Sequence, residues 1–278
     1  MAEERLKALV RRFSPLPDVH LAVWGAMVGR TGQRWVEDDG RGLWQVQVLR
    51  SPVRNGEEPQ GTLLRPAGEG DEQRFQGRRE ETETLTQRAQ QAAAALELPM
   101  QFITGEMDLE RRFLRLFFTA PGRVDFRELL RQLSRQFQMK IELRQVGPRD
   151  EARLLGGVGP CGRPLCCRTF LHQLRPIPLE LAFDQQLFFS PERITGLCGR
   201  LMCCLAYEHA QYLEALEGVP KVGEKVHLHG RSGEVVGVNI FRGTVHVAWN
   251  DGGRAEIPCQ EFKERQRKAD REDGPDTA

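Results

Sequence analysis

Six of the seven cysteines lie in two copies of one short pattern, G-x-C-G-R-x-x-C-C, at residues 159–167 and 196–204. Thiolates ligate transition metals and carry out redox chemistry, and clustered cysteines at a repeated spacing are typical of such sites. A chance repeat of this pattern is not expected. The two copies are therefore the candidate functional site, and the rest of the chain is considered for how it positions them.

The number of thiols limits what the two copies can bind. A tetrahedral zinc ion or a 4Fe-4S cluster takes four thiolates, so neither copy is sufficient alone. Six thiols serve one such site with two left over, or two sites if another chain donates ligands. The candidate metal ligands are Cys161, Cys166, Cys167, Cys198, Cys203 and Cys204.

Each copy ends in a cysteine doublet, and neighbouring side chains diverge in helices and strands alike. We therefore expect one sulfur of each doublet to ligate and the other to be a packed thiol. Taking the first member of each doublet makes Cys161, Cys166, Cys198 and Cys203 the preferred ligands. Arg163 and Arg200 would place positive charge beside the thiolates, which lowers the pKa of the thiols and favours metal ligation.

The cysteine spacing favours one kind of centre without excluding another. A C-x4-C step occurs in plant-type iron–sulfur proteins, whereas zinc ribbons use C-x2-C, so a 4Fe-4S cluster is preferred and zinc is the alternative. A cysteine-rich core without metal is a third interpretation. The chain has no C-x-x-C motif, which argues against a thiol oxidoreductase, and its six histidines are scattered, which argues against hydrolysis. We expect a protein that is not an enzyme.

Charge is distributed unevenly in a chain whose net charge is only +1. Arg111 to Arg175 holds 14 basic residues against five acidic ones. Within it, Arg127, Arg131 and Arg135 recur every four residues and share one helix face, where they could contact an RNA phosphate backbone. The same face could equally be the solvated side of an amphipathic helix. A zinc-stabilised RNA-binding module is the alternative function.

The apolar patterns predict an α+β chain of several parts. Residues 1–79 are expected to be β-rich, with strands at 19–23 and 43–48 and a long loop over 50–79 that contains one short strand at 62–64. A helix over 80–98 precedes a β-β-α-β pattern, in which strands at 101–107 and 113–118 are followed by a helix capped by Asp125 and a strand near 141–143. Residues 80–155 would form a small α/β sandwich.

The second half divides into three further regions. Residues 156–217 are the cysteine-rich extension, with short helices expected at 179–187 and 209–216. Short alternating strands with glycine turns over 218–262 predict a five-stranded SH3-like β-barrel. Cys259 lies outside both copies and is expected to be structural, and residues 263–278 are expected to be a disordered tail.

The ends and the hydropathy of the chain suggest a location. The N-terminus is charged and has no apolar signal-peptide core, and no run approaches the roughly 18 apolar residues of a membrane span. We therefore expect a cytoplasmic protein that does not insert into the membrane.

Several segments resemble one known family. Residues 122–129 (GRVDFREL), 141–147 (IELRQVG), 149–152 (RDEA) and both cysteine copies are similar to the YaaT/RicT family of stage 0 sporulation regulators, whose shared half is a PSP-type C-terminal domain. The likeness runs from about Glu80 to Ile257.

The resemblance implies a function. Members of that family form a complex with two small helical subunits of the YlbF/YmcA type, and this complex carries 4Fe-4S clusters whose cysteines come from more than one subunit. The complex acts as a specificity factor for the membrane-attached endoribonuclease Y and directs maturation of polycistronic transcripts. By this resemblance, the chain would be a non-catalytic regulatory subunit of such a complex, acting in sporulation, competence and biofilm regulation.

Overall fold

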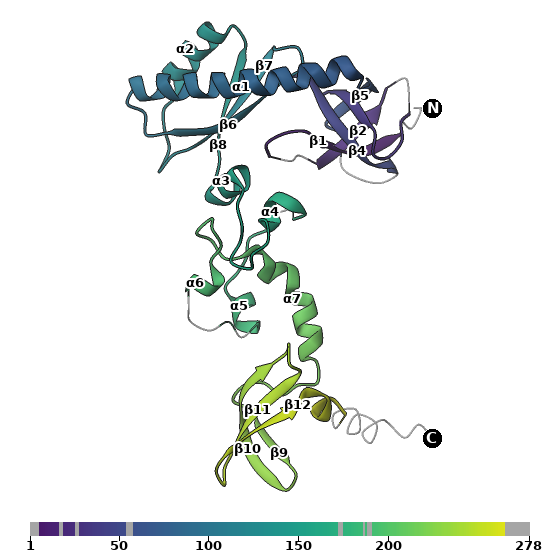
Figure 1. Cartoon of the computed structure of the whole chain (residues 1–278), viewed down its shortest axis with the longest axis vertical. Helices are drawn as coiled ribbons and strands as arrows, with labels where there is room; N and C mark the ends of the chain where they lie inside the picture. Colours follow the sequence, from purple (N-terminus) through teal and green to yellow (C-terminus); the bar gives the residue numbers. More distant parts are fainter. Residues whose placement is uncertain are drawn as a thin grey trace. The chain divides into compact units, whose positions relative to one another are not determined.

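The computed structural model describes residues 6–16, 19–25, 28–53, 58–171, 175–185, 187 and 191–264. The protein is a mixed α/β chain with three separate β-sheets. It divides into two compact units, Met1–Arg175 with Thr195–Arg200, and Pro176–Ile194 with Leu201–Ala278. Figure 1 labels the elements along the chain.

The first sheet is a closed barrel of β1 (Lys7–Arg12), β2 (Val19–Trp24), β3 (Arg34–Asp38), β4 (Leu43–Val53) and β5 (Gly61–Pro66). The strand order is β1-β2-β5-β3-β4, and antiparallel pairing of β1 with β4 closes it. Only β2 and β5 pair in parallel. Alternate residues of β1 are buried, as a two-residue side-chain period requires. The barrel core consists of Ala8, Val10, Ala22, Trp24, Trp35, Val46, Val48 and Leu63.

The long loop predicted over residues 50–79 was wrong for the described residues of this range, although the short strand predicted at 62–64 is confirmed as part of β5; residues 54–57 lie outside the described residues. β4 continues to Val53, β5 occupies Gly61–Pro66, and helix α1 (Glu69–Ala95) begins eleven residues before the predicted start at Glu80. The first three turns of α1 contain one large apolar residue, Phe75, so they lack the apolar periodicity that indicates a helix. Strands β1 and β3 were not predicted.

The second sheet contains β6 (Gln101–Met107), β7 (Phe113–Thr119) and β8 (Lys140–Gln145). β6 pairs antiparallel with β7, and α2 (Arg127–Phe137) connects β7 to the parallel strand β8. The four elements therefore follow the predicted order along the chain. α1 and α2 supply apolar residues to the core of this sheet: Leu85, Ala89, Ala92 and Ala93 from α1, and Leu129, Leu133 and Phe137 from α2.

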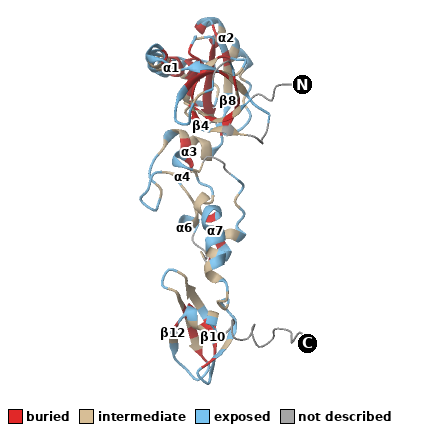
Figure 2. Ribbon diagram, turned by 90° about the vertical axis from the view of Figure 1, so that its right-hand side faces the viewer, coloured by how far each residue is buried: buried red, intermediate tan, exposed pale blue. Residues whose placement is uncertain are grey.

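Short helices occur in the cysteine-rich region and directly before it. They are α3 (Pro148–Leu155), α4 (Cys166–Thr169), α5 (Glu180–Asp184), α6 (Pro191–Ile194) and α7 (Cys203–Leu216). α5 is shorter than the helix predicted over 179–187. α7 begins six residues before the helix predicted over 209–216. Leu205 is the one buried residue of α7, so this helix has little core of its own; Figure 2 shows α7 as mostly exposed or half-buried.

The third sheet follows α7 in the second unit. β9 (Lys225–Leu228), β10 (Arg231–Asn239), β11 (Thr244–Trp249) and β12 (Arg254–Pro258) form an antiparallel sheet in the order β12-β11-β10-β9. The described residues contain four strands here rather than the five of the predicted barrel. Cys259 is buried in the core of this sheet. Of the predicted disordered tail, residues 265–278 lie outside the described residues.

Candidate functional site

The first cysteine copy folds into a tight turn. The backbone N–H of Gly159 donates to the carbonyl of Arg163 at 2.8 Å, and the N–H of Gly162 donates to the carbonyl of Gly159 at 2.9 Å. Gly162 has a φ of +77°, a left-handed conformation that glycine adopts without a steric penalty. Cys161 is exposed within this turn.

The second copy folds into the same turn. Gly196 donates to the carbonyl of Arg200 at 2.9 Å, and Gly199 donates to the carbonyl of Gly196 at 2.9 Å with a φ of +69°. Cys198 occupies the position that Cys161 has in the first copy. The sequence repeat is therefore a repeat of backbone structure, and the G-x-C-G-R residues are the ones that form the turn.

A helix begins at the doublet of each copy. Leu165 and Met202 have nearly equal extended conformations, with φ and ψ of −53° and 127° and of −60° and 131°. Cys166 is the first residue of α4, and Cys203 is the first residue of α7. Each copy thus presents one thiol from a turn and two from the start of a helix.

The two members of the first doublet differ in exposure. Cys167 is only 5% exposed, whereas Cys166 is half-buried, and Cys203 and Cys204 are both half-buried. Within the first unit, a Cβ added to Gly157 would meet the Leu197 side chain at 3.3 Å, so the turn that carries Cys198 packs beside the segment leading into the first turn.

A complete metal site is not present within the described part of this single chain. Across those residues, no three His, Cys, Asp or Glu side chains are grouped so that they could hold one ion. None of the seven cysteines, all of which are described, forms a disulfide. The donor types suit an iron–sulfur or zinc centre.

The two arginines of the repeat take part in the turns through their backbone. The carbonyl oxygens of Arg163 and Arg200 accept the turn-forming hydrogen bonds, while both side chains are exposed. Neither guanidinium bonds to another described residue. Their expected role beside the thiolates remains a prediction.

Arg168, next to Cys167 in α4, connects the first copy to α3. Its Nη1 donates to the carbonyl oxygens of Arg153 and Leu154 at 2.9 and 2.8 Å. Arg153 is 6% exposed, and burial lowers the pKa of its guanidinium, while Asp150 and Cys167 act in the opposite direction. Arg153 of α3 and Arg168 of α4 lie close to Cys167, so a substitution in α3 can affect the first cysteine copy.

The arginine face of α2 is exposed, opposite the buried Leu129, Leu133 and Phe137. Arg127 pairs with Asp125 at 2.6 Å, and Arg131 pairs with Glu128 at 2.8 Å. The Arg127 guanidinium, helped by its own backbone N–H, holds the pKa of Asp125 at about 2. Two of the three arginines predicted to contact phosphate are therefore already paired with carboxylates, whereas Arg135 has no ion pair with a described residue.

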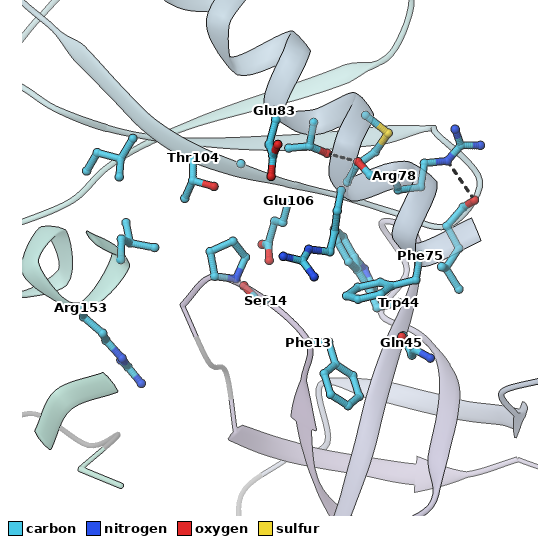
Figure 3. A pocket seen from close by; sticks show the side chains of 18 of the residues that line it. Phe13, Ser14, Trp44, Gln45, Phe75, Arg78, Glu83, Thr104, Glu106 and Arg153 are labelled. Atoms are coloured by element: carbon cyan, nitrogen blue, oxygen red, sulfur yellow. Dashed lines mark hydrogen bonds between the residues drawn. The ribbon is translucent and has the colours of Figure 1, made fainter. Parts of the chain in front are cut away.

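A cavity of about 650 Å³ lies within the first unit, and sequence reasoning missed it. The cavity is lined by the connection between β1 and β2 and by residues of β4, α1, β6 and α3. Figure 3 shows side chains of the lining residues. The lining residues come from positions up to 155 residues apart, Phe13 to Arg168. No linear pattern joins such positions, so only the folded chain brings them together.

Comparisons with known proteins match two stretches of the chain. Residues 61–146 match the PSP1 C-terminal conserved region, and residues 176–219 match the third domain of PSP1-like proteins. The chain is 47% identical over 150 residues to the stage 0 sporulation protein YaaT of Bacillus subtilis strain 168, an alignment that covers 54% of each protein. The chain thus spans about half the length of that relative. No solved structure matches significantly.

A search for membrane helices gave a negative result. Among the described helices, none is both long enough and apolar enough to cross a bilayer.

Proposed function

Because this chain belongs to the YaaT/PSP1 family, we propose that it is a non-catalytic regulatory subunit of an iron–sulfur protein complex. In this proposal the complex acts in the cytoplasm as a specificity factor for endoribonuclease Y in mRNA maturation. Small helical subunits of the YlbF/YmcA type are the proposed partners. The name of the relative, a stage 0 sporulation protein, supports a regulatory role rather than an enzymatic one.

The observation that carries the proposal is the pair of matching turns. In each copy a matching turn and the helix that follows it present three thiols, yet the described residues of one chain contain no complete metal-binding group. Structural sites that bind metal within one chain usually present four ligands. A repeated but incomplete ligand set is what a centre shared between chains requires.

The residues of this chain have separable tasks in the proposal. Gly162 and Gly199 allow the left-handed turns that expose Cys161 and Cys198, and the helix starts hold the doublets in place. A bound cluster would supply a redox-active link between subunits. Cys167, being buried, would support packing, which leaves Cys166 as the ligand of its doublet.

Anaerobic co-purification tests this proposal. The chain is expressed with its helical partners, and iron and acid-labile sulfide are measured per complex, with endoribonuclease Y binding as a second readout. Cys161→Ser and Cys198→Ser should lower the iron content and weaken the complex. Cys259→Ser is the matched control, because Cys259 is a free, buried cysteine outside the repeat. Folded, partner-bound complex without iron or zinc would refute the proposal.

Zinc in place of iron would favour the alternative, a zinc-stabilised RNA-binding module. The exposed face of α2 with Arg127, Arg131 and Arg135 supports it, although two of these arginines are already paired. Colourless protein with stoichiometric zinc and salt-dependent RNA binding would be the expected result.

We also infer two finer fold assignments. The β6-β7-α2-β8 order with α1 on the same sheet supports a small α/β sandwich, and the antiparallel order β12-β11-β10-β9 supports an SH3-like domain for residues 218–262. An experimental structure of the whole chain would test both.

A further inference from the structure

The cavity in the first unit has the size of a small-molecule site. Its volume of about 650 Å³ falls within the usual range for ligand pockets, roughly 300–1,000 Å³. Phe13 and Phe75 form part of its wall and contact each other edge to face, with ring centroids 6.0 Å apart. The cavity contains no cysteine of the repeat.

The charge of the lining favours an anion. Four arginines line the cavity, against two carboxylates, Glu83 and Glu106; the arginines are Arg78, Arg79, Arg153 and Arg168. Arg78 is partly neutralised by Glu81 at 2.7 Å. Arg79 is exposed and has no ion pair or hydrogen bond with a described residue. Arg79 is therefore the lining cation most available to a ligand.

Glu106 favours a ligand that can donate a hydrogen bond. It is only 7% exposed, and its Oε1 lies 2.5 Å from Nη1 of Arg115, which neutralises its charge. Its second oxygen, Oε2, is buried and accepts no hydrogen bond from a described residue. An unsatisfied buried acceptor is unfavourable, and a hydrogen-bond donor of a ligand in the cavity would satisfy it.

Three hydroxyl residues line the cavity as well: Thr82, whose hydroxyl donates to the carbonyl of Arg78, and Ser14 and Thr104. In Figure 3, the Glu106 side chain extends toward Ser14, whereas the Arg78 side chain extends away from Glu106 toward the carbonyl of Leu109. The lining therefore combines cations, a neutralised carboxylate with a spare acceptor, and two hydroxyls that can donate or accept.

We propose that this cavity binds a small hydroxylated anion, namely a sugar phosphate or a hydroxycarboxylate. The anionic group would pair with Arg79, and a hydroxyl of the ligand would donate to Glu106. This ligand site is independent of the cysteine repeat and of the proposed role with endoribonuclease Y.

Calorimetric titration of the full-length chain with ribose 5-phosphate, citrate and inorganic phosphate tests the proposal. Either ribose 5-phosphate or citrate should bind saturably, and which of them binds tighter identifies the ligand class. Inorganic phosphate, which lacks the sugar hydroxyls, should bind at least about tenfold more weakly than the preferred probe.

Two variants on the same helix locate the binding. Arg79→Ala should weaken the preferred probe about tenfold or more, because it removes a charge-assisted contact. Arg88→Ala removes an exposed arginine of α1 outside the cavity and should leave binding unchanged. Both residues are exposed, so neither change should prevent folding. Absence of saturable binding for all three probes up to about 10 mM, or equal losses in the two variants, would overturn the proposal.

Discussion

Asp71 accepts two hydrogen bonds from Arg65, of 2.5 and 2.8 Å, and so joins the first turn of α1 to the last strand of the barrel. Oδ2 of Asp71 also accepts the backbone N–H of Gly68 at 2.9 Å. Asp71 is 4% exposed. These contacts explain how the polar beginning of α1 is held in place without an apolar face.

The first prediction concerns pH. The Arg65 hydrogen bonds lower the pKa of Asp71 from 3.8 to about 2, so the folded state keeps this carboxylate ionised at pH values where the unfolded chain protonates it. The resulting stability, about 1–2 kcal/mol since Arg65 is half-exposed, is present above pH 3.8 and is lost as the pH falls towards 2.

Urea unfolding at several pH values checks this. Asp71→Asn should be less stable than the wild type at pH 7, and the gap should narrow between pH 4 and pH 2. Glu80→Gln, an exposed change in the same helix, serves as the control. A gap that does not vary with pH would contradict the assignment.

The second prediction concerns the junction of barrel and sheet. A Cβ on Gly42 would lie 2.6 Å from Cβ of Asp108. Asp108 is fully buried and accepts the backbone N–H groups of Arg112 and Phe113 at 2.6 and 2.8 Å, so it cannot move freely. Gly42→Ala should destabilise the chain by about 1–3 kcal/mol in denaturant unfolding.

The matched control, Gly77→Ala, should change the stability in the opposite direction. Gly77 lies inside α1 with open space around its Cβ position, so Gly77→Ala should stabilise the chain by about 0.5–1 kcal/mol. Equal effects of the two substitutions would show that the close approach at Gly42 does not matter.

The third prediction concerns α4. Arg168→Ala removes the two hydrogen bonds to the carbonyls of α3, and the amides of residues 166–171 should then exchange with deuterium faster. Arg163→Ala removes a nearby exposed guanidinium that bonds to no described residue and should not change this exchange. Unchanged exchange in Arg168→Ala would mean that α4 is held by its other contacts.

The fourth prediction separates the arginines of α2. If this face contacts RNA, Arg135→Ala should reduce the slope of log affinity against log salt by about one, because each phosphate contact releases about one counterion. Arg127→Ala should have a smaller effect, since Asp125 already occupies this guanidinium. RNA affinity that survives replacement of all three arginines would exclude this face.

Local patterns in the sequence were sufficient to predict an element whose stabilising contacts are local. The amphipathic pattern of α2 needs only its own period, so this helix could be predicted; the turns of the cysteine repeat were not predicted, although hydrogen bonds within five residues close them. The predicted length of α1 failed because its first turns depend on Arg65 and on other polar contacts. Those contacts carry no periodic signal.

The amino-acid sequence established the thiol repeat, its ligand count and the β-β-α-β order, because residue type and short spacing encode them. Folding in three dimensions added the closure of β1 on β4, the parallel pairing of β2 with β5, and the cavity that Arg79 and Glu106 both line. These features join distant segments, and many alternative pairings satisfy the same local preferences. The packing of the whole first unit selects among them.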